Sequence, residues 1–93
     1  FGEILSSENE EKVEWKVFPN PLSGEDLMIY FGTGLESQFE LIDLTGKVLI
    51  QSRLIRENVK SPFIVQLPSL KSGLYLVQMS DGVRVEQTKL LKQ

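Results

Sequence analysis

The sequence predicts an all-β fold, an Ig-like antiparallel β-sandwich of about seven strands. Short runs of branched and aromatic apolar residues alternate with turn residues, which recur roughly every 8 to 12 positions. No stretch has the hydrophobic periodicity of a helix. The chain also closes on a strong hairpin signal, because Asp81-Gly82 separates two β-prone runs.

The first strand is predicted at residues 13–18, where Val13, Trp15 and Val17 alternate with charged residues. This spacing places Trp15 in the core or at its rim. The segment Pro19-Asn20-Pro21 ends the strand, because a proline has no amide hydrogen to give to a β-ladder.

The second strand is predicted at residues 27–31, with Leu27, Ile29 and Phe31 on one face. Glycines at 32 and 34 end it. The third strand, residues 37–43, places Phe39 and Leu41 together on one side.

A turn at residues 44–46 leads into the fourth strand, residues 47–54. We expect Asp43 to accept hydrogen bonds from the turn amides and Gly46 to supply a positive φ. Residues 53–62 are predicted to be a polar loop, and residues 63–67 a fifth strand.

The sixth and seventh strands form the closing hairpin within residues 70–93, which Gly73 opens. A two-residue loop of Asp81 and Gly82 would place Met79 opposite Arg84 and mix charge into the face that carries Tyr75. A three-residue loop of residues 80–82, with Gly82 left-handed, keeps that face apolar, and it is the register that we predict. Its pairs are Met79 with Val83, Val77 with Val85, and Tyr75 with Gln87.

Ninety-three residues suffice for one domain with one modest core. No apolar run approaches the roughly 20 residues of a membrane-spanning helix, so no membrane span is expected. No basic stripe is interleaved with aromatic residues, which argues against nucleic acid as a partner.

Charge is distributed unevenly along the chain. Residues 1–14 carry five glutamates and one lysine, whereas residues 15–93 carry eight acids and nine bases, a net charge of +1. The polar, acidic composition predicts a linker at residues 1–14 and a β-sandwich domain at residues 15–93. Because the chain begins at Phe1 without methionine or signal peptide, we expect a piece of a longer protein.

The composition excludes most catalytic chemistry. The absence of cysteine and histidine removes disulfides, thiolate and imidazole metal ligands, and nucleophiles paired with histidine. The stretch Asp43-Leu44-Thr45-Gly46 departs from the Asp-Thr-Gly motif of aspartic proteases and is better interpreted as a turn. No acidic spacing matches a calcium loop. We therefore predict no catalytic residue, metal or cofactor.

Four motifs in order resemble the C-terminal sorting domain of the type IX secretion system of the Bacteroidota (type A, the Por secretion system). They are the proline turn after the first strand, the run Leu41-Ile42-Asp43-Leu44-Thr45-Gly46-Lys47-Val48-Leu49, the run Leu70-Lys71-Ser72-Gly73-Leu74-Tyr75-Leu76-Val77, and Lys89-Leu90-Leu91. The resemblance covers roughly residues 15–93.

The resemblance implies the C-terminal domain of a larger exported cargo. Such a cargo reaches the periplasm by an ordinary signal, its terminal domain is recognised by the outer-membrane translocon, and a sortase-like cysteine peptidase commonly removes that domain at the cell surface. Many cargoes of the family are joined to anionic lipopolysaccharide, and the sequence leaves open whether this cargo is anchored in that way or released. By analogy the cut falls in or just before residues 1–14, where an extended backbone can enter a protease cleft.

The resemblance also assigns motif positions. These positions are Pro19, Asn20, Pro21, Asp43, Gly46, Lys47, Gly73, Tyr75, Lys89, Leu90 and Leu91. We expect the prolines and glycines to shape the backbone, Tyr75 to lie in the core, and Asp81 and Gly82 to form the last turn. The candidates for contact with the translocon are Lys89, Leu90, Leu91, Lys92 and Gln93, because a terminal strand could pair with a partner edge.

Two other functions fit the same fold. An Ig-like or fibronectin-like interaction module could bind glycan, for which Trp15, Tyr30 and Tyr75 are the obvious aromatics. Alternation places at least two of them in the interior. A hydrolase using carboxylates alone would need two of them to converge in a cleft.

Overall fold

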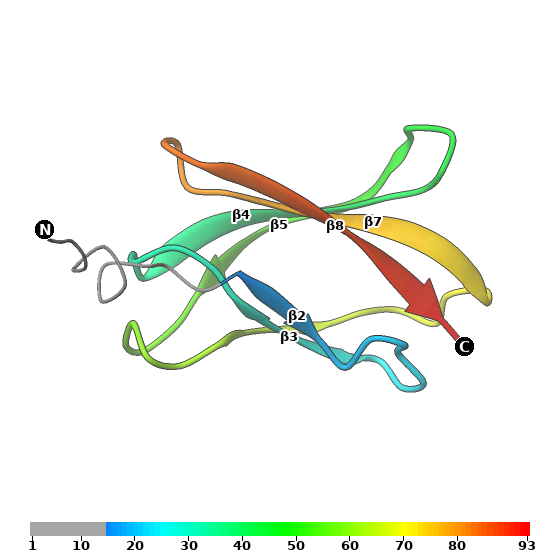
Figure 1. Cartoon of the computed structure of the whole chain (residues 1–93), viewed down its shortest axis with the longest axis horizontal. Helices are drawn as coiled ribbons and strands as arrows, with labels where there is room; N and C mark the ends of the chain where they lie inside the picture. Colours follow the sequence, from blue (N-terminus) through cyan, green and yellow to red (C-terminus); the bar gives the residue numbers. More distant parts are fainter. Residues whose placement is uncertain (1–14) are drawn as a thin grey trace, which may run out of the picture.

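The structure is a computed structural model that describes residues 15–93 (Figure 1). These residues form seven strands and no helix, which confirms the all-β prediction. The strands are β2 (Lys16–Phe18), β3 (Asp26–Tyr30), β4 (Glu36–Ile42), β5 (Val48–Ile55), β6 (Phe63–Gln66), β7 (Gly73–Ser80) and β8 (Val85–Lys92). The predicted acidic linker and Val13 lie outside the described residues.

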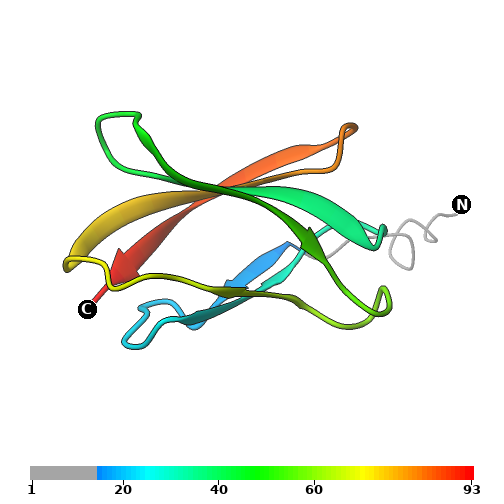
Figure 2. The same ribbon diagram turned by 180° about the vertical axis from the view of Figure 1, so that it is seen from behind.

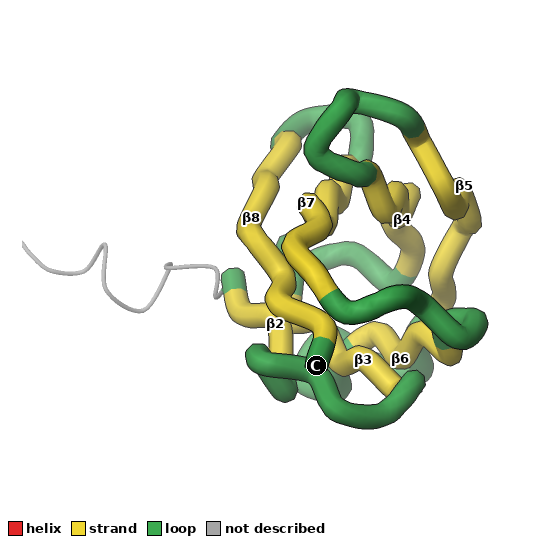
Figure 3. The backbone as a smooth tube through the Cα atoms, turned by 90° about the vertical axis from the view of Figure 1, so that its right-hand side faces the viewer, coloured by secondary structure: helices red, strands yellow, loops and turns green. Residues whose placement is uncertain are grey.

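The strands form two antiparallel sheets packed as a sandwich. One sheet has the order β2-β3-β6 and the other β5-β4-β7-β8. Figure 3 shows them as two layers, with β2, β3 and β6 below the four longer strands. The chain crosses between layers after β3, after β5 and after β6, so neighbours in a sheet are often distant in sequence.

The core lies between the two layers and follows the alternation of each strand. Leu27 and Ile29 of β3, Phe39 of β4, and Val77 of β7 are completely buried. Their neighbours in sequence point outward, as the period of two in a strand requires. The predicted inward positions on the second and third strands are therefore confirmed.

Tyr75 begins the buried row of β7 and is 9% exposed. Its hydroxyl donates a hydrogen bond of 2.6 Å to the carbonyl of Lys71, four residues upstream. A tyrosine near the start of the sixth strand that bonds back to the preceding connection is typical of Ig-like sandwiches. The expected core position of Tyr75 is confirmed.

The register predicted for the closing hairpin is wrong. The loop comprises residues 81–84, so Met79 pairs with Glu86, Val77 with Thr88, and Tyr75 with Leu90. The carboxylate of Asp81 stabilises this longer loop because it accepts the amide hydrogens of Val83 and Arg84, both at 2.9 Å. Gly82 has a φ of 92°. The predicted register was chosen to keep charged residues off the face of the hairpin that carries Tyr75 and Met79. That assumption is wrong, because Glu86 lies opposite Met79.

The predicted polar loop at residues 53–62 is also partly wrong. Strand β5 continues to Ile55, and the next residue, Arg56, is only 5% exposed. The alternation of β5 explains this, because Leu54 points into the core and Arg56 follows it by two positions. Figure 2 shows this long strand bending toward the three-stranded sheet before the connection to β6.

Candidate functional site

The five C-terminal residues predicted as contacts have different positions on β8. Leu90 is completely buried and belongs to the core. Lys89 and Leu91 lie on the opposite face, where they pair with Leu76 and Leu74 of β7. Lys92 is half-buried and Gln93 is exposed. Only part of this segment is therefore available to a partner in the folded domain.

Asn20 joins the proline turn to the C-terminal strand. Its side-chain amide donates to the carbonyl of Lys89 at 2.9 Å, and its oxygen accepts the amide hydrogen of Leu91 at 3.1 Å. Leu22 continues this contact, because its amide donates to Leu91 O and its carbonyl accepts from Gln93 N, each at 2.8 Å. Two motifs about 70 residues apart thus form one structural unit.

These hydrogen bonds lie at the end of β8, where the sequence predicts pairing with a partner edge. The backbone groups of Lys89, Leu91 and Gln93 that face away from β7 are already bonded to Asn20 and Leu22. An incoming strand would have to displace these bonds before it could pair here. Side chains, rather than a free strand edge, are what this end of β8 offers to a partner.

The predicted turn between β4 and β5 has the expected geometry. Asp43 Oδ1 accepts hydrogen bonds from the amides of Thr45 and Lys47, at 2.9 and 3.0 Å, and from the Thr45 hydroxyl at 2.6 Å. These bonds, led by the one from the hydroxyl, lower the pKa of Asp43. Gly46 has a φ of 93°, as expected. Lys47 contributes its backbone amide to this turn, and the residue is exposed immediately before β5.

A row of polar side chains crosses the outer face of the four-stranded sheet. Gln51 Nε2 donates to Glu40 at 2.8 Å, Gln78 Nε2 donates to Glu40 at 3.3 Å, and Gln87 Nε2 donates to Gln78 at 2.6 Å. The four residues are opposite one another on β5, β4, β7 and β8. We call them the polar row.

Beside the polar row, toward the C-terminal end of β8, the same face becomes apolar. Ile42 pairs with Leu76 on one side and Val48 on the other, and Leu74 pairs with Leu91. Residues opposite one another share a face of the sheet. We call these five residues the apolar patch. The patch residues come from three of the four motifs described above, at residues 41–49, 70–77 and 89–91.

Exposure values show that the apolar patch is separate from the core. Val48, Leu74 and Leu91 are 45%, 42% and 40% exposed. Ile42 is buried at 9%, yet it is not part of the core cluster between the layers. Its neighbours on the outer face therefore cover it. A small apolar cluster has formed on the outside of the sandwich.

Arg56 is a structural residue that the sequence reasoning missed. Its guanidinium donates to the carbonyls of Phe31, Gly32, Gly34 and Ser61. It also lies over the Phe63 ring at 4.3 Å from the centroid. The sequence did contain a signal for its burial, because the alternation that places Leu54 inside also places Arg56, two residues later, on the same side.

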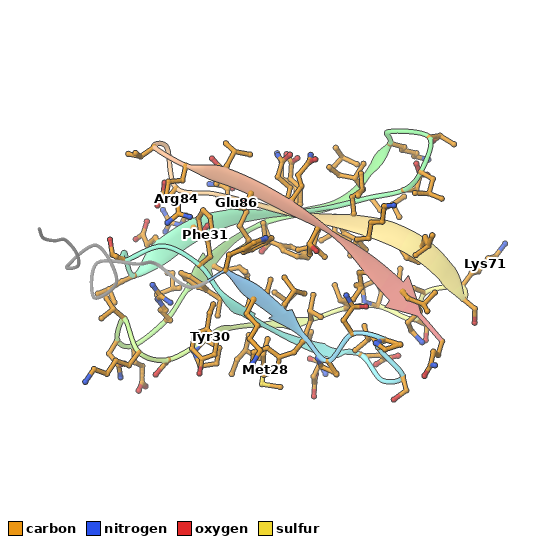
Figure 4. All side chains as sticks on the ribbon, in the orientation of Figure 1. Met28, Tyr30, Phe31, Lys71, Arg84 and Glu86 are labelled. Carbon is orange, nitrogen blue, oxygen red and sulfur yellow. The ribbon has the colours of Figure 1, made fainter. Side chains whose placement is uncertain are left out.

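The aromatics considered for a glycan site do not converge. Trp15 packs edge-on against Phe31 at 5.7 Å between ring centroids, and Tyr75 is buried. Tyr30 lies on the outer face of the three-stranded sheet (Figure 4), stacked on Phe18 at 5.8 Å.

Residues 15–93 contain no group of three or more acidic side chains placed to hold a metal ion. One surface hollow contains two carboxylates and is lined by Glu36, Ser37, Arg53, Ser80 and Asp81 among others, but each carboxylate has a nearby partner. Asp81 binds turn amides, and Glu36 lies 3.8 Å from Arg53. None of the described residues lies in a helix that could cross a membrane.

Comparison with known proteins identifies one family. A family model described as "Secretion system C-terminal sorting domain" matches residues 16–93, which include all seven strands. No curated protein matches the chain.

Proposed function

Because the chain belongs to the family of type IX secretion C-terminal sorting domains, we propose that it carries an upstream cargo from the periplasm to the outer-membrane translocon as a folded unit. Family membership places the protein in the export route of the Bacteroidota to the cell surface or the medium. The cargo precedes residue 1, and the sandwich is the part that the secretion machinery recognises.

One observation supports recognition of a folded domain rather than a linear tail. The hydrogen bonds of Asn20 to Lys89 and Leu91 tie the first motif of the family to the last. Leu90 between them is completely buried. A C-terminal segment held in this way presents its side chains in a fixed arrangement only while the sandwich is intact.

We also propose that a sortase-like peptidase removes the domain at the cell surface. The cut falls in or just before residues 1–14, whose serine-rich and glutamate-rich composition suits entry of an extended backbone into a protease cleft. The cargo is then either joined to lipopolysaccharide or released. The domain itself has no catalytic role in this process.

The decisive experiment compares export of fluorescent reporters directed to the periplasm of a host with type IX machinery. One reporter carries residues 1–93 and a second carries none of them. Both are also expressed in a strain that lacks the translocon. We expect surface or medium fluorescence only for the first reporter in the intact strain.

Retention of the first reporter in the periplasm, with the purified domain folded, would contradict the sorting function. Glycan or protein binding would then be the function to test. Cleavage is read separately, by the mass of the released reporter.

A further inference from the structure

We propose that the translocon recognises the sorting domain through the apolar patch of the four-stranded sheet and the lysines beside it. This inference rests on the proposed sorting function and assigns a surface to it. The partner is a protein surface with an apolar centre and an acidic margin. The apolar patch is Ile42, Val48, Leu74, Leu76 and Leu91, as defined above.

The first argument is that the patch is contiguous and built from four strands. Single exposed apolar residues are common on protein surfaces, but neighbouring ones on adjacent strands mark interaction sites more often. Leu76 lies between Ile42 and Lys89 across the sheet, and Leu74 lies beside Leu91. The fold leaves the three most exposed members of the patch about 40 to 45% exposed. A partner that covers them would remove this apolar surface from water, which favours binding.

The second argument is the charge around the patch. Lys89 extends its central row, Lys47 immediately precedes Val48, and Lys71 lies two residues before β7. Figure 4 shows Lys71 projecting from the end of the molecule where β7 begins. The carboxylate at this end of the sheet, Asp43, is occupied by three hydrogen bonds within its own turn. The lysines are therefore the groups available for pairing with an acidic partner.

The third argument favours a protein over an anionic lipid surface. The polar row adjoins the patch and contains the carboxylate of Glu40 together with three glutamine amides. Directional amide groups beside an apolar centre resemble the polar rim of a protein interface. A layer of anionic headgroups would face Glu40 as well as the lysines, whereas a protein can place its acidic groups opposite the lysines alone.

The other sheet supplies a matched control surface. Its outer face carries Phe18, Met28 and Tyr30, and Ile64, which is 65% exposed. Ile64 pairs with Met28 and lies in the layer opposite the apolar patch. Substitutions there change the same chemistry at a different place.

The test uses two pairs of variants of the full chain behind the periplasmic reporter. Leu74→Glu is compared with Ile64→Glu, and Lys47→Glu/Lys89→Glu with Lys16→Glu/Lys60→Glu. All four lysines are exposed, so both double variants change the net charge equally without removing core contacts. Thermal unfolding of each purified chain identifies any variant that fails to fold. The charge-reversal pair keeps the test decisive if Leu74→Glu does not fold.

We expect Leu74→Glu and Lys47→Glu/Lys89→Glu each to lower the ratio of surface to periplasmic fluorescence by about tenfold, which corresponds to about 1.4 kcal/mol of binding free energy. The control of each pair should stay close to the unsubstituted chain. Export of the folded patch variants at the level of their controls would overturn the assignment while the sorting function stands. Failure of the unsubstituted chain to be exported would instead contradict the sorting function itself.

A second measurement separates a protein partner from lipid. The purified chain is mixed with vesicles of phosphatidylcholine and phosphatidylglycerol at physiological salt, and sedimentation is measured. We expect no binding. Binding that Lys47→Glu/Lys89→Glu abolishes would overturn the choice of a protein partner.

Discussion

Arg56 has its guanidinium surrounded by carbonyl oxygens instead of carboxylates. Its four acceptors lie at 2.8 to 3.2 Å, in the connection that follows β3 and in the connection that follows β5. Burial lowers the pKa of Arg56, but an arginine keeps its proton in proteins. One side chain thus satisfies backbone groups of two segments that would otherwise lack partners.

Replacement of Arg56 tests this role at the residue scale. Arg56→Ala should reduce the free energy of unfolding by about 3 kcal/mol, because buried carbonyls lose charged donors. Arg56→Lys should restore only part of this loss, since an ammonium cannot reproduce the planar fork of donors. Urea unfolding measures both variants. Equal stability of Arg56→Lys and the unsubstituted chain would show that charge alone suffices.

Asp43 gives the domain a dependence on acid. Its pKa is lower in the folded chain than in the unfolded chain, so its carboxylate contributes stability above the unfolded value of about 3.9. This contribution is lost as the pH falls through the lower folded value. Asp81 behaves in the same way, because turn amides lower its pKa.

We therefore expect Asp43→Asn to flatten the fall in stability below about pH 4 while lowering stability at neutral pH. The melting temperature, measured from neutral pH to about pH 2.5, follows both effects. The matched control is Asp26→Asn, at an exposed position on β3. If the melting temperature of Asp43→Asn fell with pH as steeply as that of the unsubstituted chain, the hydrogen bonds in the turn would not be the source of the acid dependence.

At the scale of elements, the strands were predictable and one register was not. Alternation located Leu27, Ile29, Phe39 and Val77 correctly, since apolar side chains recur every second residue where one face is buried. The loop between β7 and β8 was mispredicted because an apolar face was expected on both strands. Strand β8 is at the edge of its sheet, where polar residues such as Thr88 are tolerated opposite core residues.

The contact of Asn20 with β8 could not be predicted either, because nothing in the sequence pairs positions about 70 residues apart. We expect Asn20→Ala to cost about 1 to 2 kcal/mol of stability, through the loss of two hydrogen bonds. Hydrogen exchange of the Leu91 amide should quicken, while amides of β4 stay protected.

Asn58→Ala is the matched control for this variant, because the Asn58 side-chain oxygen accepts a hydrogen bond from the nearby Lys60 amide within an exposed turn and not from a distant strand. An unchanged exchange rate for Leu91 in Asn20→Ala would show that Leu22 alone holds the end of β8.

At the scale of the whole molecule, the first and last described segments close the same sandwich. Leu22 and Leu90 are both buried in the core, and the backbone of Leu22 bonds to residues 91 and 93. The candidate site therefore followed from the sequence only in part. The motifs could be recognised in the sequence. Which residues of Lys89–Gln93 enter the core, which have their backbone bonded to Asn20 and Leu22, and which point outward depends on packing between distant strands.

This division decides how the C-terminal segment has to be tested. Deletion of residues 89–93 removes Leu90 from the core and the bonding partners of Asn20 and Leu22. Leu90→Ala alone should cost about 2 to 5 kcal/mol, whereas small domains have only about 5 to 15 kcal/mol in total. We therefore expect the deleted chain to be largely unfolded, measured by circular dichroism and urea unfolding. Its failure to be exported would then report folding and not recognition. A deleted chain that unfolds cooperatively near the unsubstituted midpoint would instead show that β8 is dispensable for the sandwich, and its export would directly measure the contribution of the segment to recognition.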